Sequence, residues 1–257
     1  MAAGVAGAAP QKEIVLVDYF TRAREVPVPY LEAVRGNVLA GFADRGRHEV
    51  IDAESVRELD PYHKSEAERE ESIRATGARY VVSGAVTDYA FRHETVGSKP
   101  RFTSALRLVL SGIDLKTGKT IEPEEFKLTG QGATAEEADA KALGGMQYSL
   151  LFYIDRRFKF ETQVLRLAPP DAKGRQKELY IRCGDAMGVQ RKDLFLVYLE
   201  TDMDGAVARE QIGKLRVKEV LGDEVTKCTV VKGGEQIAAA FAAGQPLVVV
   251  SDSESLF

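Results

Sequence analysis

The chain has 257 residues, of which 44% are hydrophobic and 29% are charged, and its formal net charge is −4. This composition is typical of a globular protein, and it argues against both a disordered polymer and a bilayer span of roughly 20 continuous apolar residues. Residues 158–257 carry 14 Lys and Arg against 15 Asp and Glu, so neither half has the basic surplus that attracts nucleic acid.

Residues 1–12 are expected to be a flexible lead-in. Positions 2–10 read AAGVAGAAP, which is uncharged and shows no periodic pattern. The stretch lacks the basic and apolar regions of a signal peptide. Two alternatives therefore stay open: a cytoplasmic protein, or an exported one whose signal peptide has been removed.

The first half of the chain then alternates strands with helices. Apolar residues recur at helical spacing between Leu31 and Phe42, and Gly46 is expected to end that helix. Ser65 and Glu68 form a predicted capping box at the start of a second helix, which runs to Gly77. The two strands that precede these helices are expected at Glu13–Phe20 and His48–Asp52.

Three strands and a long helix complete this half. The strands Tyr80–Phe91, Phe102–Leu115 and Thr120–Gly130 form a meander with turn chemistry after Asp114. One continuous helix is expected from Thr134 to about 158. The order β-α-β-α-β-β-β-α predicts an α+β domain over residues 13–157, with helices packed on one mixed β-sheet.

From Phe158 onward the hydrophobic pattern becomes strand-like. Short β-rich runs follow each other at close spacing, with one helical turn near residues 236–243. This predicts a small β-barrel or sandwich as the second domain, residues 158–257. The six strands are expected at Phe158–Leu167, Lys177–Cys183, Asp193–Glu200, Ile212–Leu221, Val225–Val231 and Pro246–Ser251. Cys183 and Cys228 lack CxxC spacing, which leaves open a disulfide or two buried thiols.

One glycine motif resembles a dinucleotide-binding turn. The segment Gly130–Ala135 fits GxGxxA between a strand and a helix, and Asp155 lies where such a unit places its ribose acid. The helical pattern, however, runs straight through Asp155, and that unit needs a second parallel strand there. We favour a structural role, in which the glycines make a turn, Thr134 caps the helix and Glu137 completes a capping box.

No other motif predicts a catalytic residue, a cofactor or a metal site. The acidic run Glu200–Gly205 resembles the start of a calcium loop, but Gln211 stands where a bidentate glutamate is needed. An acidic β-turn is the favoured interpretation. The histidines are only three and far apart, and no nucleophile lies in a recognisable activating context.

The first 157 residues resemble the α/β domain shared by the curli secretion lipoprotein CsgG, the amino-terminal domain of TolB, the activator LpoB and the flagellar protein FlgT. Three stretches carry the resemblance: EIVLVDYF, ATGARYVVSGAV and RLVLSGIDLKTGKTI. The run GVQRKDLFLV at residues 188–197 resembles the carboxyl-terminal β-domain of FlgT more weakly.

This resemblance implies a non-catalytic, periplasmic or outer-membrane-associated protein that contacts other envelope proteins or a second copy of itself. It carries no catalytic residue to this chain. The sequence departs from the curli channel, because the connection His93–Pro100 is polar and too short to form a membrane-spanning hairpin. The rival hypothesis is a cytoplasmic nucleotide- or small-molecule-binding enzyme that uses the Gly130–Ala135 turn.

Partners are expected to dock on the strand meander. Its sheet edge exposes unpaired backbone groups, and its two tips are basic in an otherwise acidic protein. The same charges could instead only protect the edge from aggregation, and this alternative stays open. The candidate partner-binding residues are Arg92, Lys99, Arg101, Lys116 and Lys119.

Overall fold

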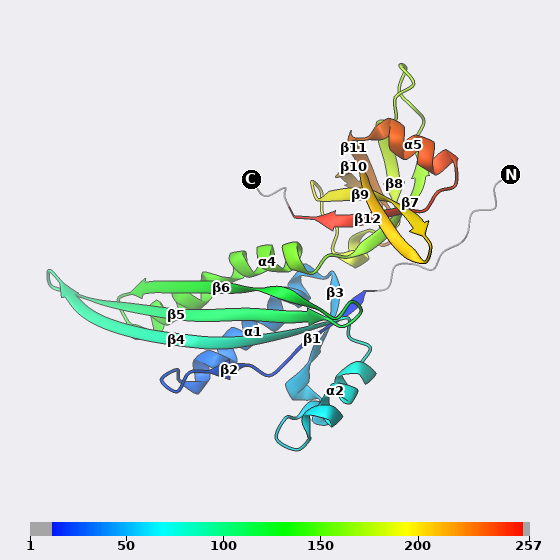
Figure 1. Cartoon of the computed structure of the whole chain (residues 1–257). Helices are drawn as coiled ribbons and strands as arrows, with labels where there is room; N and C mark the ends of the chain where they lie inside the picture. Colours follow the sequence, from blue (N-terminus) through cyan, green and yellow to red (C-terminus); the bar gives the residue numbers. More distant parts are fainter. Residues whose placement is uncertain (1–11, 254–257) are drawn as a thin grey trace. The chain divides into compact units, whose positions relative to one another are not determined.

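A computed structural model describes residues 12–253 of the chain (Figure 1). The lead-in expected at residues 1–12 lies outside the described residues except for Lys12. The described chain divides into two compact units, one spanning Glu13–Arg157 and the other beginning at Phe158.

The first unit is built on a mixed sheet whose strand order is β3-β1-β4-β5-β6. Parallel pairs join β1 to β3 and to β4, whereas β4, β5 and β6 form an antiparallel meander. The short strand β2 runs parallel to β4. The strands are β1 (Glu13–Val17), β2 (Thr21–Arg22), β3 (His48–Asp52), β4 (Tyr80–Val96), β5 (Lys99–Asp114) and β6 (Lys119–Gly132).

Helices cover both faces of the parallel part of this sheet. Leu16 of β1 packs in a core cluster with Ile73 of α2, and Val15 and Val17 point to the opposite face, since side chains alternate along a strand. The elements α1, α3 and α4 pack against one another and against β3, β5 and β6. The helices are α1 (Val28–Arg45), α2 (Glu66–Ala75), α3 (Ala135–Gly144) and α4 (Met146–Arg157), with short 3₁₀ turns η1 (Ala53–Ser55) and η2 (Arg57–Leu59).

The α+β class and the element order agree with the sequence-based prediction, and so do two helix ends. Gly46 ends α1 in the left-handed conformation, with φ 66°. Ser65 and Glu68 form the expected capping box: the Ser65 side chain accepts from the Glu68 N–H, and the Glu68 carboxylate accepts from the Ser65 N–H.

Two predicted boundaries are wrong. The long helix expected from Thr134 breaks at Gly144 and Gly145, because two consecutive glycines are poor helix formers. The polar connection expected at Arg92–Arg101 is mostly strand: β4 continues to Val96 and β5 begins at Lys99. Only Gly97 and Ser98 form the turn, and Gly97 has φ +66°.

The second unit is a closed six-stranded barrel with the order β10-β11-β8-β7-β12-β9. Its core includes Phe160, Phe195 and Ile181, none of which is more than 1% exposed. Strand β7 begins at Glu161 rather than at Phe158. The elements are β7 (Glu161–Leu167), β8 (Glu178–Ile181), η3 (Asp185–Met187), β9 (Leu194–Met203), β10 (Ala206–Val220), β11 (Thr226–Lys232), α5 (Gly234–Ala242) and β12 (Leu247–Asp252).

The cysteines and the acidic run of this unit have structural places. Cys183 and Cys228 are buried free thiols, and burial raises the pKa of the Cys228 thiol. Asp204 and Gly205 form the two-residue turn between β9 and β10 with φ 55° and 88°, as a tight hairpin requires. Over residues 12–253, no group of three or more His, Cys, Asp or Glu could hold a metal ion.

None of the helices in the described part of the chain is both long enough and apolar enough to span a membrane.

Candidate partner-binding site

The hairpin of β4 and β5 projects beyond the rest of its sheet (Figure 1). Its two strands pair from Tyr80 and Asp114 at the base to Val96 and Lys99 at the tip, whereas β6 accompanies them only as far as Phe102. All residues from 90 to 101 are exposed. We refer to this part of the hairpin, residues 90–103, as the tip segment.

A hydrogen-bonded network fixes the base of the tip segment to two helices. The Tyr30 hydroxyl of α1 donates to Asp139 Oδ2 of α3 at 2.5 Å and lies 2.8 Å from the Tyr89 hydroxyl of β4. Burial and the hydrogen bond with Asp139 raise the pKa of Tyr30. The Tyr30 and Tyr89 rings also pack, with centroids 4.4 Å apart. The base of the projecting hairpin is therefore fixed to α1 and α3 at Tyr89.

Beyond Tyr89, one face of the tip segment carries an aromatic row. The Phe102 ring stacks on His93 with centroids 4.5 Å apart, and it lies 5.9 Å from Phe91. Phe91 is 41% exposed, although large apolar side chains usually gain by burial. Together these three side chains form a small aromatic surface, in which Phe91 and His93 are exposed and Phe102 is half-buried.

The other face of the tip segment is charged. Glu94 of β4 pairs across the hairpin with Arg101 of β5, with N–O 3.5 Å. Arg92 stands opposite Thr103, and no ion pair or hydrogen bond of its side chain is found among the described residues. Nearer the base, Arg107 lies between Asp88 and Glu125 at 3.5 and 4.0 Å. Arg92 is therefore available to a group outside the hairpin.

A cavity of about 500 Å³ lies between the tip segment and the start of α3. Lys99 and Arg101 line it from the hairpin, and Lys141 lines it from α3. Lys141 donates to Glu137 at 2.6 Å, and this hydrogen bond lowers the pKa of the Glu137 carboxyl. The remaining lining includes Val96 and Pro100, so the cavity mixes cationic and apolar groups.

One edge of β4 is open along the tip segment. Strand β1 pairs with β4 only at residues 80–82, and β2 pairs only at residues 85–86. From Thr87 to Val96, no strand in the described part of the chain lies on that side of β4. Unpaired N–H and C=O groups at such an edge invite pairing with another chain.

The five predicted partner-binding residues do not form one surface. Arg92, Lys99 and Arg101 lie together in the tip segment, whereas Lys116 and Lys119 flank the β5–β6 turn at the other end of β5. Arg101 and Lys116 are 15 positions apart along β5 and the turn that follows it, or roughly 50 Å at 3.3 Å per residue. A single globular partner of modest size would contact only one of these two groups.

Sequence reasoning missed the aromatic row. The signal was present, since Tyr89, Phe91 and His93 alternate in the way that places side chains on one face of a strand. The strand was expected to end at Phe91 because the residues after it are polar. The prediction of a strand here was therefore right, but the strand is longer than predicted and ends at Val96.

The glycines of the GxGxxA motif have a packing role. A Cβ on Gly130 would lie 2.0 Å from the Ala138 carbonyl oxygen of α3, and one on Gly132 would lie 2.7 Å from the Ala138 nitrogen. Both glycines belong to β6, and neither has a positive φ, so the expected glycine turn is wrong. Helix α3 fills the space that a pyrophosphate would need.

The caps and the acid of that motif are also engaged by the protein. Thr134 is the N-cap of α3 and accepts from the Glu137 N–H, whereas the Glu137 carboxylate accepts from the Ala133 N–H. Asp155, the expected ribose acid, accepts from Arg45 Nε at 2.6 Å and from Arg47 Nη1 at 2.8 Å. These contacts give no support to a nucleotide site.

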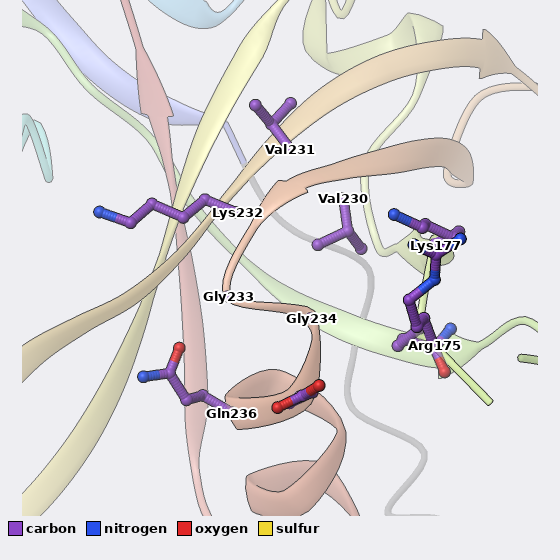
Figure 2. Close-up of a pocket in the computed structure, with 10 residues that line it drawn as sticks. Arg175, Lys177, Val230, Val231, Lys232, Gly233, Gly234 and Gln236 are labelled. Atoms are coloured by element: carbon purple, nitrogen blue, oxygen red, sulfur yellow. The ribbon is translucent and has the colours of Figure 1, made fainter. Parts of the chain in front are cut away.

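The barrel has a cavity of its own, of about 460 Å³, where β11 turns through Gly233 into α5 (Figure 2). Arg175, Lys177 and Lys232 line it, but in Figure 2 the Lys232 side chain points away from the other two. Arg175 is held by Asp171 at 2.8 Å. The cations do not converge on one point, and the cavity carries no assignment of a ligand.

Comparisons with known proteins show a likeness to several bacterial structures. Matches to this chain were found neither among protein-family models nor among curated proteins. The PelC dodecamer from Paraburkholderia phytofirmans is 17% identical with TM-score 0.36, and the match covers 58% of this chain and 91% of that one. Lipoprotein GNA1162 from Neisseria meningitidis is 15% identical with TM-score 0.41, covering 55% and 97%.

The LpoB carboxyl-terminal domain from Escherichia coli is 18% identical with TM-score 0.32, and the match covers 49% of this chain and 87% of that domain. LpoB is one of the proteins that the sequence resembles, and the resemblance to CsgG, TolB and FlgT stays a prediction. Likenesses at this level say nothing of what the chain binds.

Proposed function

We propose that this chain is a non-catalytic bacterial cell-envelope protein that acts by protein–protein contact, and that the tip segment is its contact surface. The observation that carries the proposal is the projecting hairpin, which presents Phe91, His93 and Phe102 on one face and Arg92 and the Glu94–Arg101 pair on the other. The envelope location rests on the sequence resemblance alone.

The chemistry of the tip segment fits a partner with an acidic rim around an apolar contact. Exposed aromatic and arginine side chains are the types that contribute most to binding energy at interfaces. Arg92, Lys99 and Arg101 would face the partner's acids, and the aromatic row would lose exposed area on docking. The network at Tyr30, Tyr89 and Asp139 holds the base in place, so little ordering is needed on binding.

The rival function, a nucleotide- or small-molecule-binding enzyme, is not favoured. Its motif is occupied by the backbone of α3 at Gly130 and Gly132, and its acid is ion-paired with two arginines. A pyrophosphate would have to displace the helix.

A charge-reversal experiment tests the proposal. The triple variant R92E/K99E/R101E should lose partners in a pull-down from native extract while its melting curve stays unchanged, because all three side chains are exposed. The matched control is K116E/K119E, which reverses two exposed lysines at the distant β5–β6 turn. The control should keep every partner.

Two results would speak against this site. If both variants retain all partners, the tip segment is not the contact surface, and the helical face or the barrel takes its place. If only K116E/K119E loses partners, the contact lies at the opposite end of β5.

A further inference from the structure

The open edge of β4 has a defined set of free backbone groups. A two-residue turn places Val96 and Lys99 in a pair that exchanges hydrogen bonds, and hydrogen-bonding pairs then alternate down the hairpin. By this alternation Glu94 and Arg92 bond to β5, whereas Phe91, His93 and Thr95 direct their N–H and C=O groups to the open edge. Pro100 stands opposite Thr95, which fits because proline has no N–H to donate.

A second copy of the same strand can pair with this edge in only a few registers. Two copies related by a two-fold axis run antiparallel, and residues that face each other share one face of the sheet. An axis at Arg92 sets Arg92 against Arg92 of the second copy. An axis at Glu94 likewise opposes two glutamates, and an axis at Phe91 opposes Asp88 to Glu94. Like charges in directly opposed positions destabilise a sheet.

One register turns the same charges into attractions. With the axis at His93, Arg92 faces Glu94 of the second copy and Glu94 faces its Arg92. Glu94 already pairs with Arg101 across the hairpin. On each side of the axis, Glu94 therefore lies between Arg101 of its own copy and Arg92 of the second copy. An axis at Ala90 also opposes Arg92 to an acid, Asp88, but it runs into the bulge between Val86 and Asp88 and into the β2 pairing.

We propose that the partner of the tip segment is a second copy of this chain, joined edge to edge along β4 about a two-fold axis at His93. The inference rests on the proposed function, since it uses the same contact surface. The two hairpins form a four-stranded sheet, β5-β4 of one copy followed by β4-β5 of the other. On its other face the two stacked His93–Phe102 pairs form one continuous aromatic row.

The two-fold axis makes the assembly a closed pair. The strands run antiparallel and overlap only in the tip segments, so the paired residues lie apart from the part of β4 that pairs with β1 and β2. The overlap uses residues 91–95, all of them exposed. The contact is small, so association should be weak and should depend on protein concentration.

A charge cycle tests the register. The R92E variant, and separately the E94R/R101E variant, each keep the cross-hairpin 94–101 pair but set like charges opposite each other twice in the dimer. Each should weaken dimerisation, measured by sedimentation velocity, by roughly tenfold or more. The variant R92E/E94R/R101E exchanges every sign and should restore the wild-type dimer. Failure of this rescue, or a wild-type chain that stays monomeric, overturns the inference.

A cysteine variant tests the axis independently. His93 faces itself across the axis at about 5.5 Å between Cα atoms, which suits a disulfide, so H93C should cross-link into dimers on mild oxidation. Thr103→Cys, on β5, lies one strand farther from the axis and should stay monomeric. The native cysteines are buried and should not interfere. Cross-linking of both variants to the same extent would contradict the proposed axis.

The outcomes also separate the two proposals. If the chain is monomeric while R92E/K99E/R101E still loses partners from extract, this inference fails and the contact surface stands. If the charge cycle shows rescue but no partner from extract is lost, the second copy is the partner and the inference holds without other proteins.

Discussion

Two glycines of β6 set how closely α3 lies on the sheet. A Cβ on Gly130 would meet backbone atoms of Ala138 and Ala142 at 2.0 and 2.3 Å, which no rotamer change can relieve. We therefore expect Gly130→Ala to lower the free energy of unfolding by about 2–3 kcal/mol. Chemical denaturation measures this. Gly36, exposed within α1 with open space around its Cα, is the control, and Gly36→Ala should stabilise by up to about 1 kcal/mol.

A result in which Gly130→Ala costs no more than a surface change would mean that α3 does not rest on this glycine. The motif would then need another explanation. The residue types Gly, Gly and Thr were readable from the sequence. Their role was not, because a short motif does not reveal whether a ligand or a helix fills the space above it.

Asp52 gives a residue-scale prediction about pH. Burial opposes its ionisation, but hydrogen bonds from Arg35 and from the Glu54 N–H outweigh burial and lower the pKa of Asp52. A lowered native pKa means that the ionised form adds stability above the unfolded pKa, and that this stability is lost as the pH falls through the native value. Asp52→Asn should be less stable at pH 7, and its disadvantage should shrink below about pH 3.9.

Urea unfolding of both proteins at a series of pH values checks this. The partial exposure of the Asp52 side chain screens the interaction, so the effect should be modest. If the stability difference between Asp52→Asn and the wild type stays constant down to acid pH, the negative charge of Asp52 does not contribute to its interaction with Arg35.

At the scale of elements, prediction worked where a core imposes a pattern and failed where none does. Strand β1 is buried on both faces and reads as a short apolar run, whereas α1 buries one face and shows apolar residues at helical spacing, so both are marked in the sequence. The outer part of the hairpin is exposed on both faces, and Arg92 to Arg101 therefore read as a loop. The break between α3 and α4 lies at Gly144 and Gly145. The prediction of one continuous helix relied on the apolar stripe and gave too little weight to these two glycines.

The turn of the hairpin yields an element-scale prediction. Gly97 has φ +66°, which L-amino acids rarely adopt, and open space surrounds its Cα. Gly97→Ala should therefore fray the tip segment without touching the core. We expect faster amide exchange at residues 92–101, with the melting temperature of the chain nearly unchanged. Gly118, with φ +69° in the β5–β6 turn, provides the matched control, since its alanine variant should leave the tip segment's exchange unaltered.

If Gly97→Ala instead accelerates exchange throughout β4 and β5, the tip segment is coupled to the sheet. The Tyr30–Tyr89–Asp139 network would then not keep fraying of the tip segment from reaching the rest of the sheet. Because self-pairing through β4 uses the same residues, a frayed turn should also weaken the proposed dimer.

At the scale of the whole molecule, the hydrophobic period changes from mixed to strand-like at Phe158, and the described chain divides between Arg157 and Phe158. The barrel has a core of its own, in which Phe195 is fully buried and packs edge-on against Phe160 with ring centroids 5.8 Å apart. The short spacing of turns predicted a barrel or sandwich. The sequence could not predict that the barrel is closed, because closure depends on β12 pairing with both β7 and β9.

Separate cores predict separate unfolding. Phe195→Ala removes a buried ring and should destabilise the barrel by about 3–5 kcal/mol, because it leaves a cavity that the surrounding strands fill only in part. In hydrogen exchange, protection should fall in residues 161–252 and stay unchanged in residues 13–157.

The converse variant is Phe126→Ala, since Phe126 of β6 packs on Tyr153 with ring centroids 5.7 Å apart and is buried. It should reduce protection only in residues 13–157. Equal loss in both units from either variant would mean that the chain unfolds as one cooperative body, and the tip segment would then report on the stability of the barrel as well.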